Sequence, residues 1–183
     1  MYHIKQDARS QRSAKAIIEG LESCLEKKSI SIITVSEVCA ACAVGRATFY
    51  RLFDNLTDVL SYQCENIMRH ISNKLNQGDY TVREACIYMV REWMRHVNLM
   101  KALVEGQHMD ILYEATFKHK DLIQIHASKY RTVTEDDVTF LLDFLSATLP
   151  IGLMIWYRSG KQETAEELSQ KMKMSNLFIG KLL

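Results

Sequence analysis

The stretch that decides the fold is TVSEVCAACAVGRATFYRLFDNLTDVL, residues 34–60. It opens with Thr34 and, three residues later, Glu37. This is the spacing of a capping box, in which each of the two side chains hydrogen-bonds the backbone of the other at the start of a helix. We expect a turn at residues 43–45 and a second short helix at residues 46–53. Two short helices joined by a tight turn form a helix-turn-helix.

The second of these short helices has one apolar face. Phe49, Leu52 and Phe53 follow the i, i+3, i+4 spacing that places side chains on one side of a helix. They are the expected core anchor, which leaves the other positions free to enter the major groove of DNA. Small side chains are also needed where the two helices touch. The candidates for this contact are Cys39, Ala40, Cys42 and Ala43.

Helical periodicity continues along the whole chain. A first helix is expected over residues 10–28, with an apolar stripe that includes Ala14, Ile17 and Leu21. Further capping boxes at Thr81–Glu84 and Thr164–Glu167 predict two more helix starts. The remaining stripes predict helices near residues 60–75, 82–94 and 134–160, the last with Pro150 inside it, and a short and a longer helix within 97–129. Because no strand pattern of useful length appears, the predicted fold class is all-α.

Composition agrees with a helical, globular protein. Of the 183 residues, 48% are hydrophobic and 25% are charged, and there is only one proline and seven glycines. So few helix breakers favour long helices. The net charge is only +1, which argues neither for nor against a nucleic-acid partner. The first 15 residues nevertheless form a basic arm, in which Lys5, Arg9, Arg12 and Lys15 face a single acidic residue.

The chain is expected to be cytoplasmic. It begins without an apolar leader, and its five cysteines, an odd number, are typical of reduced thiols. Residues 138–157 have the length of a membrane span, but Asp143 lies near their centre and Pro150 follows. Since a charge at bilayer depth is costly, a helix buried in a soluble protein is the better interpretation, and no membrane partner is expected.

Residues 34–60 resemble the DNA-binding signature of the TetR family of transcriptional regulators. The run from Thr48 to Phe53, with Asn55 shortly after it, carries most of the resemblance. Trp156 before Gly160, and the acidic helix start that follows, are similar to the way many members enter their last helix.

The resemblance implies an N-terminal three-helix DNA-binding domain, residues 1–54, and a larger helical domain for ligand binding and dimerisation, residues 55–183. It implies a homodimer that binds a palindromic operator on double-stranded DNA, and in most members a repressor that a small-molecule effector releases. The last two long helices would pair with those of the second copy. Position by position, Arg46 and Ala47 would face bases, and Thr34, Gly45, Thr48, Tyr50 and Arg51 would approach phosphates.

Three positions depart from the family pattern. The family often has serine where Gly45 stands, and glycine brings no hydroxyl to a phosphate. The turn glycine of the family is Ala43 here, so the turn must accept a Cβ. The family lysine at the start of the fourth helix is Leu56. These departures leave a second interpretation open, a protein-interaction module of the same fold that has lost DNA binding.

Large, adaptable side chains are candidates for an effector pocket in the second domain. They are Met89, Trp93, Met109, Tyr113, Phe117 and Trp156. Core packing explains each of them equally well, so the pattern does not separate a pocket from a core.

Catalytic and metal sites have weaker support. Cys39 and Cys42 form a CxxC pair, which is read as packing thiols because no second pair completes a zinc site. Glu105 and His108 have the spacing of a di-iron motif, but only one copy is present, so a metal-binding helical bundle is the less favoured alternative. No nucleophile–base pattern or phosphate-binding glycine loop appears, and neither catalysis nor a cofactor is expected.

Overall fold

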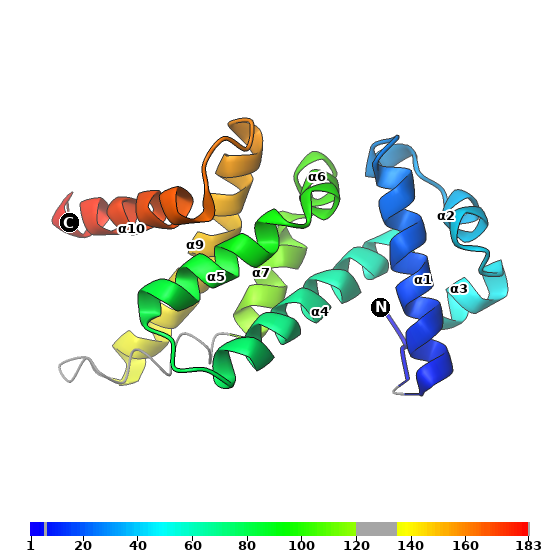
Figure 1. The fold of residues 1–183 in the computed structure, drawn as a ribbon, viewed down its shortest axis with the longest axis horizontal. Coiled ribbons are helices and arrows are strands. Elements are labelled where there is room, and N and C mark those ends of the chain that lie inside the picture. Colours follow the sequence, from blue (N-terminus) through cyan, green and yellow to red (C-terminus); the bar gives the residue numbers. More distant parts are fainter. Residues whose placement is uncertain (6, 120–134, 183) are drawn as a thin grey trace. The chain divides into compact units, whose positions relative to one another are not determined.

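The structure, a computed structural model, describes residues 1–5, 7–119 and 135–182. Its regular elements are helical, and the predicted all-α class is confirmed (Figure 1). Among the described residues, the one β-type pairing is an isolated bridge between Tyr2 and Phe53. The elements in chain order are α1 (Ala8–Leu25), η1 (Ile30–Ile32), α2 (Val35–Cys42), α3 (Arg46–Leu52), α4 (Leu56–Asn76), α5 (Val82–Met94), α6 (Val97–Glu105), α7 (Met109–Lys118), α9 (Glu135–Arg158) and α10 (Ala165–Leu182).

The chain packs as two compact units. The first contains Met1–Asn66 together with Asn98–Ile111, so α6 packs with the N-terminal helices. The second contains Ile67–Val97 and Leu112–Leu183. These packing units differ from the two predicted domains, which meet at residue 54. That boundary separates the predicted DNA-binding and ligand-binding roles, and it stays a prediction.

Helix α1 is the centre of the first unit, with α2 and α3 packed against it (Figure 1). The side chains of Ala14, Ile17 and Leu21 are completely buried, as their spacing predicts. Helix α6 adds Leu99 and Met100, which are also completely buried. Burial of a side chain of this size contributes about 1.5–3 kcal/mol. The N-terminal helices are therefore held by a core of their own.

The observed ends of α1 correct the expected ones. The helix begins earlier because the Asp7 carboxylate caps it, accepting from the backbone N–H of Ser10 at 2.9 Å. It ends at Leu25, so Lys28 lies beyond it instead of in its last turn. Lys101 also brings a positive charge to this end, because its Nζ donates to the Leu25 carbonyl oxygen at 2.9 Å.

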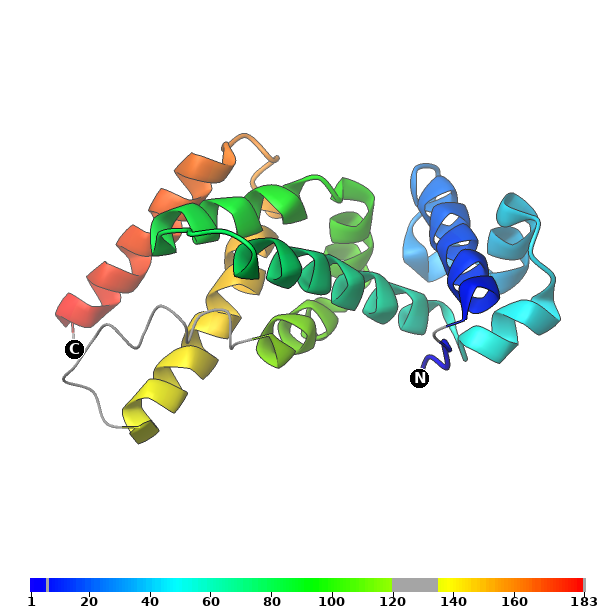
Figure 2. The same cartoon turned by 60° about the horizontal axis from the view of Figure 1, so that its bottom comes forward.

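The second unit is built on α5, which packs against α9 and α10 (Figure 2). The predicted capping box at Thr81 is present: the Glu84 N–H donates to the Thr81 hydroxyl oxygen, and the Glu84 carboxylate accepts from the Thr81 N–H. The corresponding bonds at the start of α10 join Thr164 and Glu167. Local capping therefore places both helix starts where the sequence predicts them.

Helix α9 continues on both sides of Pro150. Its predicted first residue, Thr134, lies outside the described residues. Residues 120–129, the last part of the region predicted to hold a short and a longer helix, lie outside them as well. In the described part of 97–129, α6 and α7 have similar lengths, 9 and 10 residues, instead of one short and one longer helix. Among the described residues, no helix combines the length and apolar character that crossing a membrane requires.

Candidate nucleic-acid interface

The turn between α2 and α3 has the geometry of a tight helix-turn-helix. Ala43 is in the left-handed region, with φ 53° and ψ 30°, so the turn does accept a Cβ at this position. The N–H of Val44 donates to the Cys39 carbonyl oxygen at 3.1 Å and closes the end of α2. Gly45 then caps α3 in extended conformation, and the Phe49 N–H donates to its carbonyl oxygen at 3.0 Å.

The start of α2 is fixed by the predicted capping box. The Thr34 hydroxyl oxygen accepts from the Glu37 N–H at 3.3 Å, and the Glu37 carboxylate accepts from the Thr34 N–H at 2.8 Å. Lys28 also donates to this carboxylate. The Lys28 hydrogen bond, followed by the Thr34 backbone, lowers the pKa of Glu37 to about 2. Glu37 is therefore ionised at neutral pH, and Thr34 is held at the exposed start of the helix-turn-helix.

Helix α3 buries one face and exposes the other. Phe49 and Phe53 are completely buried and Leu52 is 1% exposed. The two phenylalanine rings lie 5.8 Å apart, centroid to centroid. The exposed positions are Arg46, Ala47, Tyr50 and Arg51, and Thr48 is half-buried. The helix thus presents two arginines and a tyrosine outward from an aromatic anchor.

A close approach of α1 and α2 sets the position of this helix pair. A Cβ added at Gly20 would lie 2.8 Å from Cys42 Cβ and 2.9 Å from the Val38 carbonyl oxygen, so only glycine fits there without displacement. Cys39 is buried beside this contact, but Ala40 and Ala43 are exposed, which corrects their expected place in the helix contact. Sequence reasoning missed Gly20 because its partner is two elements away.

The first residues of the chain pack against the end of α3. The His3 N–H donates to the Leu52 carbonyl oxygen at 2.8 Å, and the His3 ring lies 3.1 Å from an Asp54 carboxylate oxygen. The ring of Tyr2 stacks edge-on against that of Tyr62, with centroids 5.2 Å apart. The Leu52 carbonyl at the end of α3 is therefore satisfied by the first residues of the chain.

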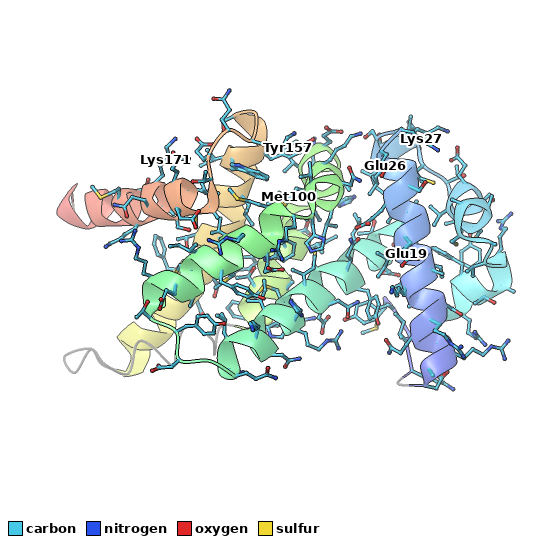
Figure 3. The ribbon with its side chains drawn as sticks, in the orientation of Figure 1. Glu19, Glu26, Lys27, Met100, Tyr157 and Lys171 are labelled. Atoms are coloured by element: carbon cyan, nitrogen blue, oxygen red, sulfur yellow. The ribbon has the colours of Figure 1, made fainter. Side chains whose placement is uncertain are left out.

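The basic residues of the predicted arm are all exposed. They are Lys5, Arg9, Arg12 and Lys15. Lys15 makes an i, i+4 ion pair of 3.8 Å with Glu19, which projects from α1 (Figure 3). Because exposed pairs of this kind are weak, they leave the arm's cations available to a polyanion.

The chain matches no family model and no curated protein sequence. Solved structures do resemble it. Lin0861 from Listeria innocua superposes with a TM-score of 0.78 at 18% identity, over 97% of this chain and 96% of that one. A TetR transcriptional regulator from Streptococcus agalactiae 2603V gives 0.63 at 23% identity, over 88% and 92%. The dihydroxyacetone kinase operon activator DhaS gives 0.65 at 15% identity, over 92% and 95%.

The chain has the TetR-family fold. At these identities the likeness is one of fold, and fold alone does not assign a function. Within the TetR-family fold, the structure shows the surroundings of two of the positions that depart from the family pattern. A Cβ at Gly45 would meet nothing within 4 Å, so the position is open to a larger residue. Leu56, the first residue of α4, is half-buried and brings no charge.

The predicted effector residues are distributed over both units of the TetR-family fold. Met109 lies in the first unit and the other five lie in the second. Trp93 is completely buried, and Trp156 is 5% exposed. Tyr113 and Phe117 are half-buried and their rings lie 5.8 Å apart. The structure therefore brings Tyr113 and Phe117 together, and it places Trp156 in the wall of a groove between α9 and α10.

The proposed di-iron spacing is not arranged as one helical face. Glu105 is the last residue of α6, Gln107 has φ 60°, and His108 precedes α7. In the parts of the chain that the structure describes, no three histidine, cysteine or acidic side chains gather as metal ligands would. The five cysteines are all free thiols, and burial is the main cause that raises the pKa of Cys39.

Proposed function

We propose that this chain is a dimeric, DNA-binding transcriptional regulator of the TetR type. The observation that carries the proposal is the two-faced α3 helix, whose buried phenylalanines leave Arg46, Tyr50 and Arg51 exposed. A helix of this kind, held at its start by a tight turn, suits the major groove of DNA, which is about 12 Å wide. The proposed regulator is a repressor that a small-molecule effector releases, as in most members of the family, although one neighbour in fold, DhaS, is an activator by name.

Each exposed residue has a role in this proposal. Arg46 and Ala47, at the first turn of α3, face base edges, and an arginine on guanine discriminates by about 1–3 kcal/mol. Thr34, the Gly45 N–H, Thr48, Tyr50 and Arg51 approach phosphates and set the register of the helix. The cations of residues 5–15 add affinity that depends on salt.

Dimerisation through α9 and α10 is the second part of the proposal. Phe144, Ile151 and Ile155 lie on one face of α9 and are 44%, 51% and 56% exposed. Met174 on α10 is 54% exposed. These four exposed apolar side chains favour a protein partner, and in the proposal a second copy of the chain pairs with them by two-fold symmetry. Residues 1–54 would read DNA, and residues 55–183 would dimerise and bind an effector.

The effector is proposed to be a small molecule bound in the second part of the chain. Met89, Trp93, Tyr113 and Phe117 lie on α5 and α7. Ligand and operator would favour different separations of the two α3 helices, so that each weakens the binding of the other.

Selection from random duplex DNA tests the proposal. The dimer should recover a palindrome whose half-sites lie about one or more helical turns apart. The salt dependence of binding to the recovered duplex should reflect several phosphate contacts. Recovery of no sequence at low salt would instead support the interaction module, in which Leu56 stands where the family pattern has a lysine.

A further inference from the structure

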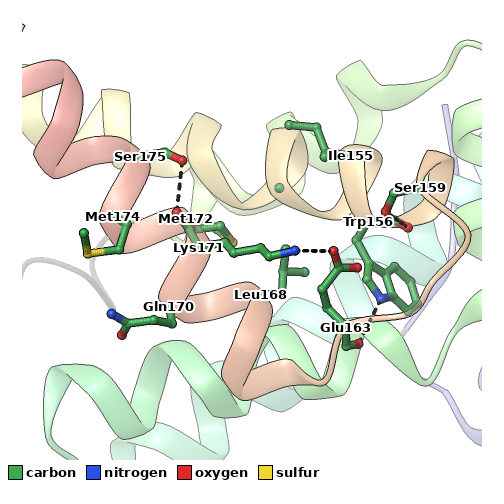
Figure 4. Close-up of a pocket in the computed structure, with 11 residues that line it drawn as sticks. Ile155, Trp156, Ser159, Glu163, Leu168, Gln170, Lys171, Met172, Met174 and Ser175 are labelled. Carbon is green, nitrogen blue, oxygen red and sulfur yellow. Dashed lines mark hydrogen bonds and ion pairs between the residues drawn. The ribbon is translucent and has the colours of Figure 1, made fainter.

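The two tryptophans of the chain both lie in the second unit, but their indole N–H groups have different surroundings. The Trp156 N–H donates to the Glu163 backbone oxygen at 3.2 Å (Figure 4). Trp93 lies on α5, and its side chain is completely buried. Its indole N–H is buried too and has no hydrogen-bond partner in the described part of the chain. Trp93 therefore carries a donor that the described residues do not satisfy.

An unpaired donor at a buried position is costly. A buried polar group without a partner is unfavourable, and native structures rarely leave one. A buried tryptophan usually donates its N–H to an acceptor, whereas phenylalanine would fill an apolar core without any polar group. A bound molecule that brings an acceptor to Trp93 would remove this cost, and the unpaired N–H is thus a first indication of a ligand.

The face of α5 that carries Trp93 reaches the surface at Met89. Met89 lies about one helical turn before Trp93 and on the same face of the helix. Its side chain is half-buried, and the flexible methionine thioether adapts its shape to what packs against it. Met89 is therefore the side chain of this face that a small molecule can displace in order to reach the indole.

The buried charges of the second unit decide which acceptor fits. Among its described residues, the buried polar and charged side chains are those of Glu92, Thr116 and Ser146, so none is a lysine, arginine or histidine. Glu92 is itself acidic and accepts from Arg95, which is exposed, at 2.7 Å. A carboxylate or phosphate bound beside Trp93 would thus be buried without a counter-charge, which costs far more than burial of a neutral group. The acceptor that fits is neutral.

We propose that the second unit binds an uncharged, largely apolar molecule with a carbonyl oxygen, which accepts the hydrogen bond of the Trp93 N–H. Ketones, esters and lactones have this chemistry. The inference rests on the proposed function, because it takes the second part of the chain as the effector site and names the class of its effector. Trp93 selects the carbonyl group, and Met89 contacts the apolar part of the molecule.

Straight-chain methyl ketones of increasing length test the carbonyl. Each is compared with the alkene of the same shape, in which a CH₂ group replaces the carbonyl oxygen. In protein labelled with ¹⁵N at its indoles, at least one ketone should move the Trp93 N–H signal downfield and saturably, as a new hydrogen bond does. The Trp156 signal should stay in place, since its N–H is already bonded. The alkenes should cause no downfield shift.

The variant Trp93→Phe separates the hydrogen bond from the hydrophobicity of the probes. It keeps an aromatic ring and removes the donor, so the ratio of ketone affinity to alkene affinity should fall about tenfold, as expected for one net hydrogen bond. Trp156→Phe is the matched control, because it removes a donor that the chain itself satisfies, and it should leave the ratio unchanged. The titration of the native chain does not require Trp93→Phe to fold.

Three results would overturn the proposal. The first is a Trp93 signal that no ketone moves. The second is the same ratio of ketone to alkene affinity in the native chain and in Trp93→Phe. The third is tighter binding of the fatty carboxylate than of the ketone of equal length, which would mean that a cation lines the site.

These binding measurements use no DNA, so they fail separately from the proposed function. Recovery of a palindrome from random duplexes, with no ketone bound at Trp93, would leave the regulator and exclude this effector class. Ketone binding at Trp93 in a chain that recovers no sequence would support the carbonyl site and remove the DNA-binding role.

Discussion

Helices α3 and α9 each bury one face and expose the other, but their exposed faces have opposite chemistry. On α3 the solvent side carries Arg46, Tyr50 and Arg51. On α9 it carries Phe144 and Ile151, along with Ile155 one turn later. Cations and an aromatic hydroxyl suit a polyanion, whereas an apolar stripe suits another protein surface. The comparison shows that exposure alone does not identify the class of partner. The chemical type of the exposed side chains identifies it.

Loss of the α3 anchor should give the largest effect. Phe49→Ala removes a completely buried ring and should lower the free energy of unfolding by about 3–5 kcal/mol, measured by urea denaturation. Tyr50→Ala is the matched control, since the Tyr50 side chain is 47% exposed; it should cost about 1 kcal/mol at most. Equal losses for the two variants would mean that α3 is not two-faced.

A charge on the exposed face of α9 should break the dimer and leave the monomer folded. Ile151→Glu places a carboxylate in the proposed interface and should weaken dimerisation by about 100-fold, as loss of a strong interface contact does. Sedimentation over a range of concentrations measures this. Ile32→Glu changes an isoleucine that is 63% exposed in the first unit, and it should leave dimerisation unaltered. A dimer that tolerates Ile151→Glu would place the interface elsewhere.

A substitution in the turn before α3 should stabilise the chain instead of destabilising it. Ala43 has φ 53°, a conformation that glycine adopts without strain, so Ala43→Gly should stabilise the chain by about 1 kcal/mol. Ala40→Gly, at an exposed position inside α2, should destabilise it by about the same amount. If both variants moved the unfolding midpoint in one direction, the left-handed turn would not be the source of the difference.

The smallest effect should come from the exposed cap of α2 and should depend on pH. The pKa of Glu37 is lowered from 4.5 to about 2, so its contribution is fully present above pH 4.5 and is lost as the pH falls toward 2. Glu37→Gln should therefore lower the unfolding midpoint at pH 7 and make no difference well below pH 2. Glu114→Gln serves as the control, and a loss independent of pH would exclude the carboxylate as its cause.

The first helices could be predicted from the sequence because local interactions decide them. The capping box at Thr34 and the spacing of Phe49, Leu52 and Phe53 act within a few residues. The features that could not be predicted from the sequence are long-range contacts. The Gly20 approach to Cys42 joins two helices, and the contact of Lys101 with Leu25 spans 76 residues. No local pattern signals either contact.

In the second part of the chain, the local pattern carries less information about function. Periodicity marks Trp93 and Trp156 as inward-facing, but it does not distinguish a core residue from one that lines a groove. The structure separates them: Trp156 lines the groove beside Glu163, and the Trp93 side chain is completely buried. The contacts of Glu163 with Trp156 and Lys171 depend on the crossing of α9 and α10, which the sequence does not encode locally.

The most direct test of the central claim compares operators selected by the native chain and by Arg46→Ala. Arg46 is exposed at the first turn of α3, so its loss should relax the preference at one base position in each half-site and leave dimerisation unchanged. Arg83→Ala, an exposed arginine on α5, should select the native operator. An identical operator for native chain and Arg46→Ala would contradict the claim that this face of α3 reads DNA.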